Sequence, residues 1–156
     1  MKIATMLYNS RNINILMIFV EHGFDVNLLN GIILECAILD GNISNIKNLL
    51  DRSADPNIGF RQMPLLIAID LRNESIINLL LDYGADIKCI DTKLLAQMVN
   101  FGSIEFIKLL GKYSVDLTML NDYNYTNINT TNKINYLMEI GIDAIKIVEI
   151  MNVNMK

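Results

Sequence analysis

One phrase recurs five times along this chain of 156 residues, and this internal repeat constrains the fold more than any other feature. Each copy is an apolar run followed by glycine or serine and, two residues later, by aspartate, as in residues 80–86. The aspartates are 30, 31, 30 and 27 residues apart: Asp25, Asp55, Asp86, Asp116 and Asp143. A period of this size is typical of stacked repeats, in which similar units build one extended core.

The residues before each aspartate line up in apolar columns. One column reads Leu16, Ile46, Ile77, Ile107 and Ile134, and the next reads Phe19, Leu49, Leu80, Leu110 and Leu137. Because positions three residues apart share one face of an α-helix, each repeat is predicted to carry an amphipathic helix. A Gly/Ser column follows it: Gly23, Ser53, Gly84, Ser114 and Gly141. Glycine there is predicted to close the last turn in the left-handed conformation; serine does so less comfortably or ends the helix another way.

A second helix is predicted to precede this one in each unit. Residues 63–68 show it best, because proline is tolerated in the first helical turn and Pro64 therefore marks a helix start. The two helices together resemble the ankyrin repeat, whose inner helix opens with Thr-Pro-Leu-His-x-Ala and whose outer helix ends in Leu-Leu-x-x-Gly-Ala-Asp. Pro64, Leu65 and Ala68 match the opening phrase. In the second repeat, Glu35 occupies the position of the histidine of that phrase. Losing the family's Thr/His pair predicts looser turns.

The resemblance covers roughly residues 1–143. It implies an all-α ankyrin-repeat solenoid of stacked helix-turn-helix units, with short or vestigial β-hairpins because the period falls below the usual 33 residues. We divide a single domain, residues 1–156, into repeats at about 1–30, 31–60, 61–91 and 92–120, with a degenerate repeat and C-terminal cap at 121–156. The short period is similar to that of ankyrin repeats in large DNA viruses.

Charge and hydropathy bear on partners and location. The net charge of −4 argues against nucleic acid as a ligand, because phosphate binding needs a basic patch. Apolar stretches are too short for a membrane span, and polar residues from Asn9 onward interrupt the N-terminal run too early for a signal peptide. We therefore expect an intracellular protein, cytoplasmic or nuclear, in the host cell if the source is viral. We expect a monomer.

The residues offer little for catalysis. His22 is the only histidine and falls in a tolerant column at the end of an outer helix, which predicts a surface residue. The recurring aspartates are predicted to bond the turn backbone. Cys36 and Cys89 occupy different repeat positions and are read as small buried or semi-buried residues. We predict no catalytic residue, metal site or cofactor, and the lone histidine disfavours the alternative of a small metal-dependent hydrolase.

The ankyrin resemblance implies a binding face. Ankyrin partners contact hairpin tips and the ends of inner helices, which places the candidate partner-binding residues at Leu39, Asp40, Asp70, Leu71, Asn100, Phe101, Phe60 and Arg61. Leu39, Leu71 and Phe101 would form an exposed apolar stripe flanked by acids, unless they tilt inward as core. The hypothesis is a non-enzymatic protein–protein interaction module, acting on a host protein if viral. The alternatives are an adaptor that recruits targets to a ubiquitin ligase and a structural or decaying paralogue.

Overall fold

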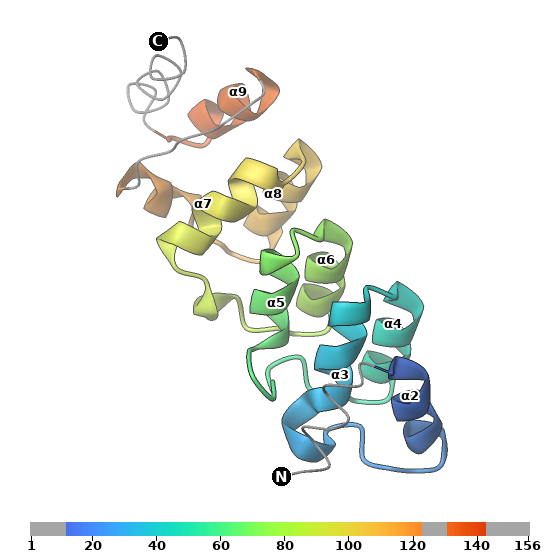
Figure 1. Cartoon of the computed structure of the whole chain (residues 1–156). Coiled ribbons are helices and arrows are strands. Elements are labelled where there is room, and N and C mark those ends of the chain that lie inside the picture. Colours follow the sequence, from blue (N-terminus) through green and yellow to red (C-terminus); the bar gives the residue numbers. More distant parts are fainter. Residues whose placement is uncertain (1–11, 123–130, 143–156) are drawn as a thin grey trace, which may run out of the picture. The chain divides into compact units, whose positions relative to one another are not determined.

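A computed structural model describes residues 12–122 and 131–142 (Figure 1). Within these ranges the regular elements are helices and no strand occurs, which confirms the all-α class. The chain forms two compact units, residues 1–86 and 87–156. Most of the weak segment 121–129 and the final helix expected after Asp143 lie outside the described residues. The division into repeats stays a prediction.

The first unit holds five described helices. These are α2 (Ile13–Glu21), α3 (Leu28–Asp40), α4 (Ile43–Asp51), α5 (Pro64–Asp70) and α6 (Glu74–Asp82). Helix α3 packs against α5, α4 packs against α6, and the two pairs are joined through α3 with α4 and α5 with α6 (Figure 1). Helix α5 begins at Pro64, as predicted. The core lies between these pairs, where Ile46, Ile77 and Leu80 are fully buried.

The second unit contains α7 (Thr92–Phe101), α8 (Ile104–Lys112), α9 (Thr131–Glu139) and the 3₁₀ helices η1 (Ile87–Cys89) and η2 (Leu117–Asp122). Helix α7 packs with η2, and α8 packs with α9. Lys133 in α9 is largely buried, and its Nζ donates to the carbonyl oxygens of Val99 and Asn100, both at 3.3 Å. A cation at these carbonyls is favourable because they form the C-terminal end of α7, where the helix dipole is negative.

Side-chain caps start the outer helices at corresponding positions. Asn12, Asn42, Asn73 and Ser103 precede α2, α4, α6 and α8, and each side-chain oxygen accepts from a backbone N–H of the first turn. The first N–H groups of a helix have no partner within it, so such a cap contributes about 1 kcal/mol. These residues recur at the period of the aspartates, which ties each helix start to the sequence.

The Gly/Ser column ends the outer helices as predicted. Its five members have φ angles of +86°, +69°, +87°, +60° and +90°: Gly23, Ser53, Gly84, Ser114 and Gly141. Glycine takes this conformation freely, whereas the two serines carry a side chain into it at a cost of about 1–2 kcal/mol each. The two serines therefore close the last turn in the strained left-handed conformation and do not end the helix in another way.

The recurring aspartates bond the turn that follows each helix. The Oδ1 atoms of Asp25 and Asp55 accept from the N–H groups of Asn27 and Asn57, at 2.9 and 2.8 Å. Asp116 accepts from both the N–H and the hydroxyl of Thr118, at 2.9 and 2.6 Å. The prediction that these carboxylates serve the turn backbone is confirmed for the three residues.

Asn27 and Asn57 carry the connection onward from one turn to the next. Nδ2 of Asn27 donates to the carbonyl of Ser53 at 3.0 Å, and its Oδ1 accepts from the N–H of Asp55 at 2.8 Å. Asn57 repeats the arrangement, bonding the carbonyl of Gly84 at 3.1 Å and the N–H of Asp86 at 2.7 Å. We call this series of bonds the asparagine ladder. It joins three successive turns of the first unit without a β-strand.

The ladder predicts a specific stability effect. Replacing Asn57 with alanine removes both bonds at once and should lower the free energy of unfolding by about 1–3 kcal/mol. The matched control is Asn48→Ala, because Asn48 is an exposed helical residue that bonds only to Arg52 of its own helix among the described contacts. Denaturant titration measures both variants. Equal effects of the two substitutions would contradict a role of the ladder in stability.

Asp116 predicts a pH effect. The hydroxyl and then the N–H of Thr118 hold the pKa of the Asp116 carboxyl below its ordinary value. A lowered folded-state pKa stabilises the fold above the unfolded pKa, and this contribution is lost as the pH falls through the folded value. Thr118→Val should move the Asp116 pKa upward in an NMR titration, whereas Thr118→Ser should keep it low. An unchanged pKa in the valine variant would exclude the hydroxyl as the main cause.

Candidate interaction surfaces

The inner-helix ends of the first unit carry four of the predicted binding residues. Leu39 and Asp40 end α3, and Asp70 and Leu71 end the neighbouring α5. Asp40, Asp70 and Leu71 are exposed, with Leu71 at 47%, whereas Leu39 is half-buried. Asp70 accepts from Nε2 of Gln62 at 3.1 Å. These residues form a surface of one exposed apolar side chain beside two acids, presented by two packed helices.

Asn100 and Phe101 belong to the second unit and are both half-buried. The Phe101 ring is stacked on Phe106, with centroids 6.1 Å apart and planes 23° apart. The Asn100 carbonyl accepts from Lys133. Since Leu39 and Leu71 lie in the first unit, the predicted stripe of three residues spans both units and stays a prediction. Leu39 and Phe101 are half-buried, whereas Leu71 is exposed.

Arg61, one of the two residues predicted at a hairpin tip, is held by a carboxylate whose role sequence reasoning missed. Glu35 in α3 is completely buried, and its Oε2 accepts from the backbone N–H of Arg61 at 3.0 Å. Glu35 stands where the ankyrin phrase has histidine, so it braces the turn that was expected to be looser. The sequence signal for this buried carboxylate was an acidic residue within the apolar run 32–38. Phe60 is half-buried, and Arg61 is exposed.

The loop between α4 and α5 is held at three places, by α3 and by the turn that precedes α3. Asn27 bonds residues 53 and 55, Glu35 bonds residue 61, and Gly31 approaches the carbonyl of Ile58 between them. A Cβ on Gly31 would lie 2.5 Å from that carbonyl oxygen, so a larger residue does not fit. The three anchoring residues are four positions apart in sequence. The loop therefore has a defined position on the first unit.

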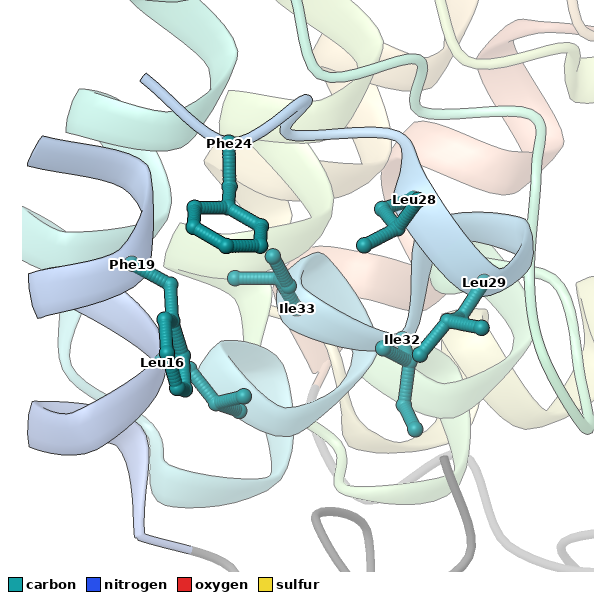
Figure 2. Close-up of a pocket in the computed structure, with 7 residues that line it drawn as sticks. All are labelled: Leu16, Phe19, Phe24, Leu28, Leu29, Ile32 and Ile33. Carbon is teal, nitrogen blue, oxygen red and sulfur yellow. The ribbon is translucent and has the colours of Figure 1, made fainter. Parts of the chain in front are cut away.

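A second surface is an apolar groove between α2 and the start of α3 (Figure 2). Its cavity volume is about 120 Å³, and its walls are entirely apolar: Leu16, Phe19, Phe24, Leu28, Leu29, Ile32 and Ile33. The Phe19 and Phe24 rings are 5.1 Å apart and tilted by 58°. Figure 2 shows the Phe24 side chain between α2 and the first turn of α3. Sequence reasoning did not identify this groove.

The groove exposes residues whose counterparts are buried. Phe19 is 38% exposed, whereas Leu49, Leu80, Leu110 and Leu137 in the same column are fully buried. Phe24, Leu28 and Leu29 are 51%, 43% and 36% exposed. Large apolar residues that gather on a surface are characteristic of interaction sites, although single exposed ones are common. The column had predicted Phe19 as a core residue, and its exposure departs from the burial of the other four members.

A strained turn holds one wall of the groove. Leu29, Asn30 and Gly31 all have left-handed backbone angles, with φ of 57°, 58° and 72°. This conformation is unfavourable for leucine, by about 1–2 kcal/mol. The close approach of Gly31 to the carbonyl group of Ile58 holds this left-handed turn in place. Leu28 and Leu29 are consequently held at the edge of the groove by tertiary contacts that oppose the local preference.

Other candidate chemistry is sparse. His22 is exposed at the end of α2, as predicted, and its Nδ1 lies 2.8 Å from the carbonyl oxygen of Ile18. Cys36 is buried and Cys89 half-buried, which confirms their assignment, and neither forms a disulfide. Among residues 12–122 and 131–142, no group of three or more His, Cys, Asp or Glu side chains could hold a metal ion. None of the helices described is long and apolar enough to cross a membrane.

Comparison with models of known protein families, with curated proteins and with solved structures finds no match to this chain.

The Glu35 brace generates a prediction at a single amide. Glu35→Leu removes the acceptor of the Arg61 N–H, and the loss of a hydrogen bond worth about 1 kcal/mol should speed exchange of that amide about fivefold. Glu35→Gln keeps an acceptor oxygen at the same place and should preserve protection. Hydrogen exchange followed by NMR measures both variants, with the Gly84 amide as internal reference. Unchanged exchange at Arg61 in Glu35→Leu would show that the loop is held elsewhere.

Proposed function

We propose that this chain is a non-enzymatic protein-interaction module of the ankyrin-repeat type, which binds a partner protein at the ends of its inner helices. The proposal is supported above all by Leu71, an exposed apolar side chain at the end of α5, beside the carboxylates of Asp70 and Asp40. Binding energy at protein interfaces concentrates in a few such apolar anchors that become fully buried.

The ankyrin assignment is supported by what recurs in the structure. Outer helices begin at capped Asn or Ser residues and end at left-handed Gly or Ser residues at the period of the sequence repeat. The asparagine ladder joins successive turns where a hairpin would otherwise stand. Each of these features recurs because each repeat must present the same surfaces to the next repeat in the stack.

The partner surface is held rigidly, which favours binding. Helices α3 and α5 pack together, and buried Ala37, Ile38, Ala68 and Ile69 fill the region just before their exposed ends. Rigid presentation reduces the side-chain and loop entropy lost when a complex forms. The acids at these ends reinforce the negative potential of two helix C-termini. A partner with a basic residue beside an apolar contact would suit this surface.

Leu71→Ser tests the proposal. Leu71 is about half exposed, so the substitution should change the free energy of unfolding by no more than about 0.5 kcal/mol while weakening partner binding about tenfold or more. Ile43→Ser is the matched control, because Ile43 is 39% exposed in the same unit but starts the outer helix α4. The measurement is affinity capture from cells that express the chain, followed by mass spectrometry, alongside thermal melting.

The expected result is a set of proteins captured by the wild type and by Ile43→Ser but lost with Leu71→Ser. Capture of the same proteins by all three chains would rule out the inner-helix ends as the binding surface. A strongly lowered melting temperature for Leu71→Ser would show that Leu71 is part of the core.

A further inference from the structure

We propose that the apolar groove between α2 and the start of α3 binds a basic amphipathic helix of a partner protein. This site is separate from the inner-helix ends, since the groove lies at the beginning of α3 and Asp40 lies at its end. It therefore goes beyond the proposed function and stands on its own residues.

The groove has the size and lining for an apolar side chain. Its volume of about 120 Å³ is close to that of protein cavities that accept a benzene-sized group, so it suits one leucine or phenylalanine side chain. No polar atom contributes to its surface. A polar side chain would lose its water contacts there without gaining a hydrogen bond. The occupant must therefore present an aliphatic or aromatic residue.

The apolar surface extends beyond the cavity along α2. Ile15 is 44% exposed and lies four residues before Phe19, so both are on the same face of this helix. Phe24 and Leu28 line the groove together with Phe19 (Figure 2). A helix with apolar residues at positions i, i+3, i+4 and i+7 covers an elongated surface of this kind, whereas a single side chain does not.

Charge selects a basic partner. The sequence contains no lysine or arginine from Asn12 to Ile46, whereas Glu21 lies between Phe19 and Phe24 and Asp25 directly follows Phe24; both acids are exposed. Glu21 ends α2, where the helix dipole adds negative potential and the last turn has no basic residue. Complementary charge at an interface raises the association rate and disfavours partners of the wrong sign. An amphipathic helix whose polar face carries lysine or arginine meets both requirements.

The walls of the groove are prepared for binding. Leu28 and Leu29 are held by the left-handed turn 29–31, and Gly31 anchors this turn beneath the loop that contains Ile58. The rings of Phe19 and Phe24, both in the wall of the groove, lie 5.1 Å apart. A binding site whose side chains are already positioned loses little entropy when the ligand arrives. The strain at Leu29 is consistent with a functional position, because such conformations concentrate at binding sites.

The test uses the full-length chain and designed peptides. The probe is a synthetic helix of roughly 16 residues with leucines and one tryptophan on one face and lysines on the other, long enough to form a helix on binding. Because the chain contains no tryptophan, the peptide's fluorescence reports binding directly. A second peptide has glutamate in place of every lysine. The protein variants are Phe24→Ser and Leu28→Ser, with Ile43→Ser and Leu71→Ser as controls outside the groove.

We expect saturable binding of the lysine peptide that weakens with added salt, and binding of the glutamate peptide at least about tenfold weaker. Phe24→Ser and Leu28→Ser should each weaken binding of the lysine peptide about tenfold, whereas Ile43→Ser should bind as the wild type does. Leu71→Ser separates the two surfaces: if the peptide bound at the inner-helix ends, which also suit a basic residue beside an apolar contact, this variant would weaken binding and the groove variants would not. Two groove variants are used in case one of them does not fold. Circular dichroism shows whether each variant is folded.

Three outcomes would overturn the proposal. Equal binding of the lysine and glutamate peptides would remove the charge selection, and unchanged binding by both folded groove variants would place the peptide elsewhere. Sedimentation provides the third: a wild-type dimer that becomes monomeric in Phe24→Ser would show that a second copy of the chain covers the groove.

Discussion

The amides of Asn27 and Asn57 provide the connection on which the first unit depends. The turns they join contain backbone N–H and C=O groups that need partners, and no strand supplies them in this part of the chain. An asparagine side chain offers a donor and an acceptor together, so one residue satisfies both groups of the next turn. Lysine offers donors only, and Lys88 at the following position cannot form the same pair of bonds. The ladder ends at Asp86, where the first compact unit also ends.

Both interaction surfaces result from this fixed arrangement. The ladder and Glu35 hold the loop before α5, which sets the position of Arg61 relative to α3, whereas Leu71 follows α5, which itself packs against α3. The same loop supports Gly31 and thereby the left-handed turn that exposes Leu28 and Leu29. The inner-helix ends offer one apolar anchor among acids, whereas the groove offers a continuous apolar surface. A change in the loop is therefore expected to affect both surfaces together.

The local features of the fold could be predicted from the sequence because short-range interactions decide them. Pro64 starts α5, the Gly/Ser column ends the outer helices, and Asp25 and Asp55 bond their own turns. Each of these involves groups within a few residues of one another. The recurrence of asparagine two positions after aspartate, at residues 27 and 57, was a readable signal for the ladder. It was missed because the bonds it makes reach 26 to 29 residues along the chain.

By itself, the sequence determined the all-α class, the start of α5 at Pro64, the ends of the outer helices and most of the two apolar columns, because these features depend on interactions within one helix. The tertiary structure alone decided which apolar residues are exposed. Phe19 shares its column with buried leucines yet lines a groove, and Phe101, for which the sequence left both an exposed and a core position open, is half-buried and stacks on Phe106. Glu35 is buried because a backbone N–H from the next loop reaches it. Whether a residue is exposed, and which group it bonds, depends on neighbours that are distant in sequence. A local sequence pattern does not give the positions of those neighbours.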